Sequence, residues 1–204
     1  MMNVLMEHFG QWGAVIFFII VYGIAILFIP FYKKMERKPA FTYLAFVIAF
    51  AIEMHGIPFS MLLISSILGR SLPEGILWGH TMIDYVGYMG LYLNIGFALA
   101  GMLMIIFGWY QIYHGYWKKV DGSGHIVSDG MYKYIRHPQY TGLILIALGM
   151  VLGWATLTNL IMLPIIIYMY YRLSLREEKH MIEEFGDAYI IYMKHTKRFI
   201  PWII

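Results

Sequence analysis

Long apolar stretches separated by short polar ones dominate the pattern of this chain. The apolar stretches are residues 13–32, 41–69, 87–114, 138–153 and 158–175. A helix that spans a bilayer needs about 20 consecutive apolar residues, and no part of the chain alternates short strands with helices. The pattern therefore predicts an all-α protein: a polytopic integral membrane helical bundle with about five transmembrane segments.

The stretch 41–69 is longer than one span needs and is interrupted by polar residues and a proline. It carries Glu53, His55 and Gly56, followed by Pro58. Because proline removes a helical hydrogen bond, we expect a kink or break here that gives two half-helices. Glu53 and His55 either form a substrate or proton site or satisfy the backbone groups freed at the kink, and we favour the second interpretation.

The last two apolar stretches predict a helical hairpin. Residues 138–153 rise only about 24 Å as a helix, which makes this arm short for a membrane span. Gly149 and Gly153 put two small residues on one face, a spacing that lets helices approach closely. Beyond Arg176 the pattern becomes that of an amphipathic helix ended by Pro201, which we expect to lie over the cytoplasmic face as a lid. Its apolar stripe is Met181, Phe185, Tyr189 and Tyr192.

Composition agrees with a membrane protein and excludes several functions. Of the 204 residues, 60% are hydrophobic and 13% charged, and there is no cysteine. Thiol chemistry is therefore excluded, no basic run is long enough to indicate nucleic acid, and the histidines lack zinc-binding spacing, so we expect no metal. We expect one structural unit, with N-terminal transmembrane helices in 1–114 and a catalytic region in 115–204.

Basic residues follow the first apolar stretch and recur in later loops. They include Lys33, Lys34, Arg37 and Lys38 after the first stretch, and Lys118 and Lys119 after the third. Because cytoplasmic loops carry an excess of Lys and Arg, the N-terminus is expected outside and the catalytic face and the C-terminus in the cytoplasm.

The densest polar chemistry lies at the two outer ends of the expected hairpin. One cluster is GMYKYIRHPQYTG, residues 130–142, in which Pro138 begins a helix whose free N–H groups favour anions. The other is RLSLREE, residues 172–178. In an antiparallel hairpin these ends lie on the same side of the membrane, so we expect the two clusters to form one site for a charged small molecule.

RHPQY, a hydrophobic hairpin and RLSLREEKHMIEEFGDAYIIYMKHTKRFIP together resemble the C-terminal half of the isoprenylcysteine carboxyl methyltransferase family. The resemblance covers about residues 128–201, and related motifs occur in membrane phospholipid methyltransferases and some sterol reductases. It implies S-adenosylmethionine as the methyl donor. It also implies a lipid-modified acceptor, a prenylcysteine carboxylate, whose chain enters between helices from the bilayer.

The resemblance and the residue types together suggest roles for nine residues. Arg172 lies within apolar sequence and either holds the acceptor carboxylate or is a snorkelling anchor, and Glu177 is the second candidate catalytic residue. Cations and helix N–H groups suit the donor's carboxylate, acids its positive groups, and aromatic rings its adenine. The candidate cofactor-binding residues are Gln111, Arg136, His137, Tyr140, Glu178, Tyr189 and Tyr192.

Three alternatives stay open at this point. A phospholipid amine fits as an acceptor nearly as well as a prenylcysteine. A reductase of the sterol type would use NADPH instead, although those relatives usually have Asn where Gln139 stands here. A membrane scaffold without enzymatic activity is the third alternative, and the two polar clusters argue against it.

Overall fold

The structure is a computed structural model that describes residues 10–28, 34–69, 88–117 and 125–201. The described residues are all-α, as the apolar pattern predicted, with seven α-helices and short 3-10 and π turns. The number of about five transmembrane segments stays a prediction. By length and composition, three helices can cross a membrane, Lys38–Gly56, Met89–Gly115 and Leu157–Phe185, and shorter apolar helices accompany them. Of the basic residues used to predict orientation, Lys33, Lys118 and Lys119 lie outside the described part of the chain.

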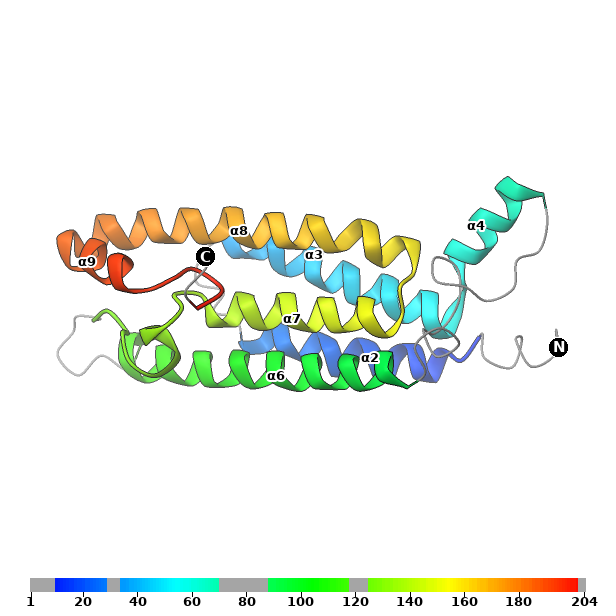
Figure 1. Cartoon of the computed structure of the whole chain (residues 1–204), viewed down its shortest axis with the longest axis horizontal. Helices are drawn as coiled ribbons and strands as arrows, with labels where there is room; N and C mark the ends of the chain where they lie inside the picture. Colours follow the sequence, from blue (N-terminus) through cyan, green and yellow to red (C-terminus); the bar gives the residue numbers. More distant parts are fainter. Residues whose placement is uncertain (1–9, 29–33, 70–87, 118–124, 202–204) are drawn as a thin grey trace.

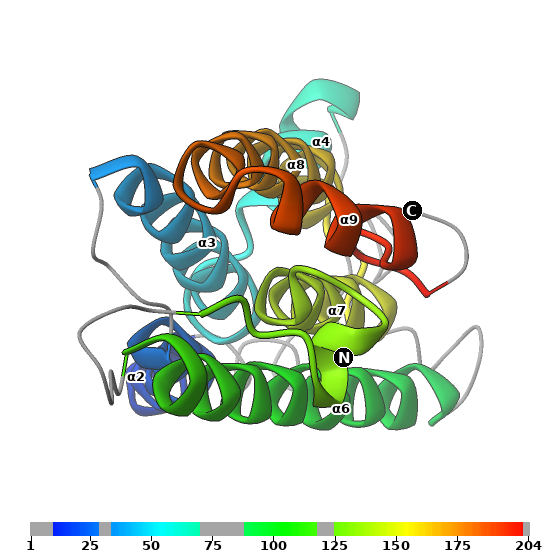
Figure 2. The same cartoon turned by 90° about the vertical axis from the view of Figure 1, so that its left-hand side faces the viewer.

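The α-helices are α2 (Trp12–Gly23), α3 (Lys34–Ala51), α4 (Phe59–Leu68), α6 (Met89–Ile112), α7 (Pro138–Gly153), α8 (Leu157–Phe185) and α9 (Asp187–His195). Five of them, α2, α3, α6, α7 and α8, run side by side along the long axis (Figure 1). Helix α7 lies inside the bundle, against α6 on one side and α8 and α3 on the other (Figure 2). The core around it is apolar, and its largest fully buried side chains include Tyr43, Phe46, Phe50, Leu143, Ile146 and Tyr170.

Glycines allow α6 and α7 to pack backbone against backbone. A Cβ added to Gly101 would overlap the backbone carbonyl of Gly142, and the reverse is also true. Further along α7, a Cβ on Gly149 would lie 2.9 Å from Phe97 Cβ, and one on Gly153 would lie 2.9 Å from the side chain of Asn94. The close approach predicted for the Gly149 and Gly153 face is therefore confirmed, and α6 is the partner.

The helix of the stretch 41–69 is broken, as we expected from the position of Pro58. Helix α3 ends in a π turn at Ile52–Gly56, and α4 begins after an extended Ile57. A carboxylate oxygen of the buried Glu53 accepts a 2.6 Å hydrogen bond from the backbone N–H of Ser60, in the first turn of α4. Glu53 thus satisfies a backbone donor freed by the break, which is the interpretation favoured for it from the sequence.

The expectation of a separate amphipathic helix from Arg176 to Pro201 is wrong. Helix α8 continues without interruption to Phe185, and Gly186, with φ of 57°, ends it. Residues 172–184 contain good helix formers and neither glycine nor proline, so nothing stops the helix at the end of its apolar part. The following α9 ends at His195, six residues before Pro201.

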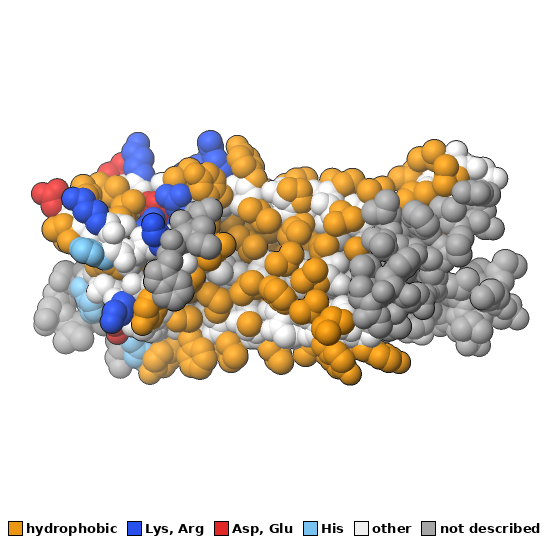
Figure 3. All heavy atoms as spheres, in the orientation of Figure 1, with side chains coloured by type: hydrophobic (Ala, Val, Ile, Leu, Met, Phe, Trp, Pro, Cys, Tyr) orange, Lys and Arg blue, Asp and Glu red, His pale blue; other side chains and the backbone are white. Residues whose placement is uncertain are grey.

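The surface divides along the long axis of the molecule. In Figure 3 apolar side chains cover the middle, whereas charged and histidine side chains gather at one end, over the region of α9 and the end of α8. Among the described residues, this apolar middle is typical of a membrane-spanning bundle. The loop before α7 lies at the same end (Figure 1).

The glycine contact between α6 and α7 can be tested by substitution. We expect Gly101→Ala to destabilise the protein by about 1–3 kcal/mol, because its methyl group meets the backbone of α7. Gly96→Ala is the matched control on the same helix, since a Cβ there has no atom within 4 Å. Melting temperatures in detergent give the comparison, and equal melting temperatures for the two variants would contradict the proposed packing.

Candidate functional site

The loop that leads into α7 is fixed on the end of α6. Gly130 has a φ of 53°, in the left-handed region, and packs against the side chain of Gln111 with no room for a Cβ. Gln111 Oε1 accepts a hydrogen bond of 3.3 Å from the backbone N–H of Met131. The hydroxyl of the buried Tyr132 donates to the carbonyl of Gly108 over 3.4 Å. These contacts therefore fix the position of the loop residues that lead to His137.

His137 stands immediately before the first turn of α7. Pro138 takes the first helical position, where a missing N–H costs nothing. The N–H groups of Gln139 and Tyr140, in the same turn, have no carbonyl four residues earlier within the helix to bond to. This end of α7 consequently carries partial positive charge next to the His137 ring.

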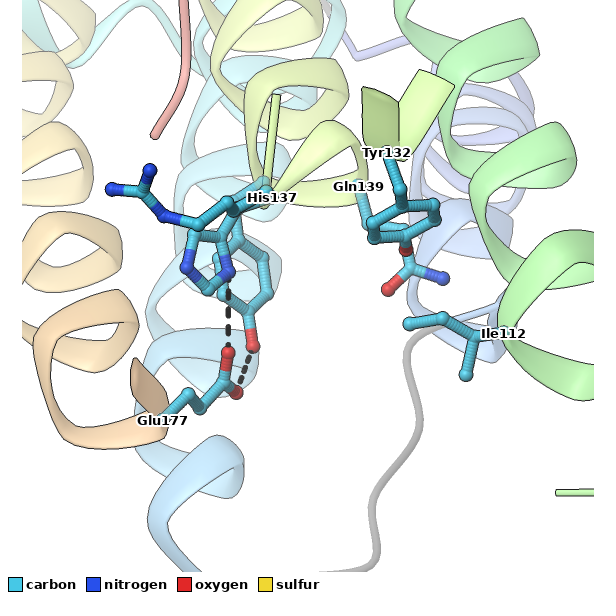
Figure 4. Close-up of a pocket in the computed structure, with 7 residues that line it drawn as sticks. Ile112, Tyr132, His137, Gln139 and Glu177 are labelled. Atoms are coloured by element: carbon cyan, nitrogen blue, oxygen red, sulfur yellow. Dashed lines mark hydrogen bonds and ion pairs between the residues drawn. The ribbon is translucent and has the colours of Figure 1, made fainter. Parts of the chain in front are cut away.

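Two consecutive acids of α8 meet this helix start. His137 Nδ1 lies 3.4 Å from a carboxylate oxygen of Glu177, and His137 Nε2 lies 3.3 Å from Oε1 of Glu178. The Tyr140 hydroxyl donates to the Glu177 carboxylate, and the rings of His137 and Tyr140 stack with centroids 5.5 Å apart. The expected meeting of the two polar clusters is therefore confirmed (Figure 4).

Glu178 is buried and is the most heavily bonded of the acids in the site. It accepts from Arg136 Nε at 2.8 Å and from the guanidinium of Arg198 through both oxygens. Only 4% of its side chain is exposed. The two arginines and His137 make four polar contacts with this carboxylate, three of them to Oε1 and one to Oε2.

The charge on His137 follows from its surroundings. Burial lowers the pKa of an imidazole, but the hydrogen bonds and negative charges of Glu177 and Glu178 together outweigh burial. The net effect raises the pKa of His137 above its ordinary value. The two acids thus favour the protonated form of the ring.

A cavity of about 40 Å³ opens beside these side chains. In Figure 4, His137 and Glu177 point toward one another on one side of the cavity, and Tyr132, Gln139 and Ile112 lie on the other. Its walls combine a cationic part, an anionic part and apolar surface. The lining residues are Ile112, Tyr132, Arg136, His137, Gln139, Tyr140 and Glu177.

Four of the nine residues proposed from the sequence line this cavity: Arg136, His137, Tyr140 and Glu177. Glu178 lies directly behind them, bonded to His137. The helical hairpin brings these residues together, because it places His137 in contact with Glu177, 40 positions further along the chain. The catalytic role of Glu177 and the cofactor-binding roles of the other four residues stay predictions.

The other four proposed residues lie outside the cavity lining. Gln111 holds the loop at Gly130, and Tyr192 donates a 2.7 Å hydrogen bond to the carbonyl of Tyr132, with Tyr189 packed against its ring at 5.5 Å. Arg172 is exposed on the outer face of α8. Their proposed roles are untested by this geometry and stay predictions.

Three lining residues were not proposed from the sequence. Gln139 and Tyr132 lie within the stretch 130–142 that the sequence singled out, but neither has a charge or a pattern that sets it apart. Ile112 is a neighbour of the proposed Gln111, and one step along a helix turns a side chain by about 100°. Gln139 also donates to the carbonyl of Phe28, over 3.2 Å, so its amide ties the cavity wall to the first helical segment.

Comparison with known proteins now adds to the geometry. Residues 82–188, more than half of the chain, match the family described as phospholipid methyltransferase. The chain belongs to this family. It is therefore a membrane methyltransferase by family, and its several apolar helices make it a multi-pass membrane protein.

One curated relative supports the resemblance seen in the sequence. A protein-S-isoprenylcysteine O-methyltransferase from Schizosaccharomyces pombe is 30% identical over 79 residues. The similarity covers 38% of this chain and 34% of that protein, so the matched stretch is about a third of the relative's length. Across the described part of this methyltransferase, no group of three or more histidine or acidic residues is arranged to hold a metal ion.

The His137 ion pairs predict a pH-dependent stability. A raised pKa in the folded state means that this contribution is fully present below the ordinary histidine pKa of about 6.5 and is lost as pH rises through the raised value. We expect His137→Gln to lower the melting temperature most near about pH 6, with the gap to the wild type narrowing toward about pH 9. His195→Gln, at an exposed position, is the control. A gap that stays constant with pH would contradict the buried ion pairs.

Proposed function

We propose that this member of the phospholipid methyltransferase family transfers a methyl group from S-adenosylmethionine to a lipid-linked acceptor. The preferred acceptor is a prenylcysteine carboxylate, and the reaction occurs at the cytoplasmic end of the bundle. The carrying observation is the cavity between α7 and α8, where the His137–Glu177 pair and the first turn of α7 meet. The curated relative and the basic residues at this end, including Lys133, Arg176 and Lys179, support the proposal.

The chemistry of the cavity wall fits the amino-acid half of this donor. S-adenosylmethionine, when bound, supplies a methyl group activated on a positively charged sulfonium. Its carboxylate suits the first-turn N–H groups of α7, which lie beside the His137 ring. Its ammonium or sulfonium suits Glu177, which is bonded to His137 and Tyr140 and faces the cavity.

The size of the cavity sets a condition on binding. Its volume of about 40 Å³ accommodates a few water molecules. Pockets that bury a small-molecule ligand usually measure about 300–1,000 Å³. Binding the donor therefore has to widen the cavity, and we propose that side chains at its mouth move to do so.

The acceptor needs orientation more than proton transfer. A carboxylic acid with a pKa of about 4 is already ionised at neutral pH, so methylation of a prenylcysteine requires alignment for in-line displacement. Arg172 is our candidate for holding that carboxylate, because it is exposed on α8 and lies within apolar sequence, where an acceptor's lipid chain would give way to its polar head. It precedes Glu177 by five residues, about 7.5 Å along the helix axis.

A phospholipid amine is the second candidate acceptor, and the description of the matched family favours it. An ammonium group has no lone pair, so an amine acceptor must lose a proton before it is methylated. Glu177 is the carboxylate beside the cavity that is able to take it. Amine methylation should consequently rise with pH, whereas carboxylate methylation should change little above about pH 6.

Donor binding tests the first part of the proposal. We expect S-adenosylmethionine or its demethylated product to raise the melting temperature of the purified protein, and NADPH to have no effect. Glu177→Gln should weaken donor binding about tenfold or more, since a hydrogen bond to a charged group contributes about 1.5–3 kcal/mol. Glu183→Gln, an exposed acid of the same helix, is the matched control. Stabilisation by NADPH and by neither donor form would favour the reductase alternative.

Turnover of Arg172 variants tests the acceptor assignment. If Arg172 holds the acceptor carboxylate, Arg172→Ala should leave donor affinity nearly unchanged and reduce turnover at least about tenfold, or about 1.4 kcal/mol. Arg172→Lys should recover little of the activity, because an ammonium lacks the planar pair of donors. Arg176→Ala, one turn further along and also exposed, is the control.

The substrates to compare are a farnesylcysteine analogue and phosphatidylethanolamine. Near-normal turnover of Arg172→Lys on the farnesylcysteine analogue would make Arg172 a membrane anchor instead. Methylation of phosphatidylethanolamine alone would move the assignment to the second candidate.

A further inference from the structure

The end of the chain lies across the loop that carries His137. We call residues 196–201 the C-terminal strap. Backbone pairing joins it to the loop: Lys197 N–H donates to the carbonyl of Tyr134 at 3.0 Å, and Arg136 N–H donates to the carbonyl of Lys197 at 2.8 Å. The next pair, from His137 N–H to the carbonyl of Arg198, is 3.1 Å long. The strap thus follows the loop residue by residue up to the start of α7.

Side chains secure the same contact. Thr141 donates a 3.0 Å hydrogen bond to the carbonyl of Phe199, and the Phe199 ring lies 6.0 Å from the His137 ring. Arg136 Nη1 donates to the backbone carbonyl of Thr196, and its Nε donates to Glu178. The strap is therefore part of the wall behind His137, although none of its residues lines the cavity.

Arg198 makes the most specific of these contacts. Its Nε lies 3.0 Å from Glu178 Oε1 and its Nη2 lies 2.5 Å from Oε2, which is the two-pronged geometry of a guanidinium on a carboxylate. The same Oε1 receives Arg136 Nε at 2.8 Å and His137 Nε2 at 3.3 Å. Glu178 therefore lies between the strap and the histidine and couples one to the other.

We propose that Arg198 is a positioning residue, which holds Glu178 so that His137 presents its other nitrogen to Glu177 at the cavity. Arg198 touches neither the cavity nor the proposed ligand and acts through Glu178. With Arg198 absent, Oε2 of Glu178 loses its arginine partner, and the carboxylate is no longer held in one orientation against the imidazole. The effect on ligand binding rests on the proposed function, whereas the coupling to His137 does not.

The groups facing His137 determine what a titration should detect. They are Glu177 and Glu178 from α8, Tyr140 from α7, and Arg136 and Arg198, which act on the ring through Glu178. Removing the Arg198 charge leaves Glu178 less neutralised. The stronger negative charge beside the ring should then raise the pKa of His137 further.

The experiment is an NMR titration of ¹⁵N-histidine-labelled full-length protein in detergent, with the His137 signals assigned by their loss in His137→Gln. We expect Arg198→Met to move the His137 midpoint upward by about half a pH unit or more. Lys197→Met removes a neighbouring, exposed cation of the strap and should leave the midpoint unchanged. Arg198→Gln removes the charge but keeps a hydrogen-bond donor, and it replaces Arg198→Met if that variant does not fold.

Affinity for S-adenosylhomocysteine, measured by calorimetry on the same samples, separates the proposed function from the positioning role of Arg198. We expect it to fall about tenfold in Arg198→Met, to recover in part in Arg198→Lys, and to be unaffected in Lys197→Met. A His137 midpoint that does not move when the Arg198 charge is removed overturns the positioning role. If the wild type does not bind S-adenosylhomocysteine, the proposed function fails, and the titration alone decides whether Arg198 positions His137.

Discussion

The polar end of this molecule depends on one buried carboxylate, Glu178, and the cations that neutralise it. Arg136 comes from the loop before α7, Arg198 from the C-terminal strap and Glu178 from α8, so a single set of ion pairs joins three separate segments. Removing one partner of a buried ion pair leaves an uncompensated charge, which costs about 3–5 kcal/mol. Moving α8 away from the other two segments would leave the Glu178 charge uncompensated, and this penalty opposes that movement.

The hairpin and the broken helix could be predicted because local sequence specifies both. Pro138 marks the first residue of α7, and Pro58 marks the break, since proline restricts the backbone wherever it stands. The strap had no such signal. Its pairing of Ile135 with Lys197 joins residues 62 positions apart, and no local pattern encodes a contact of that kind.

The candidate site could be predicted in part, because the local sequence also marks its polar residues. Charged residues are rare in this chain, so a cluster of them at the ends of a hairpin indicates a site even without a structure. Which side chains face the cavity depends on helix rotation, and neighbouring residues differ by about 100°. Ile112 lines the cavity and Gln111 does not, and Glu177 lines it whereas Glu178 stands behind. Sequence alone does not fix that rotation.

The same rotation explains why two consecutive acids and a histidine work together. Glu177 and Glu178 diverge around the axis of α8, and an imidazole, with nitrogens on two edges, reaches both. The cluster also contains the guanidinium groups of Arg136 and Arg198. With the His137 ring protonated, it carries three positive charges and two negative ones. Loss of the His137 proton makes the numbers equal. The protonation state of this one residue therefore decides whether the cavity wall attracts an anionic group or is electrically balanced.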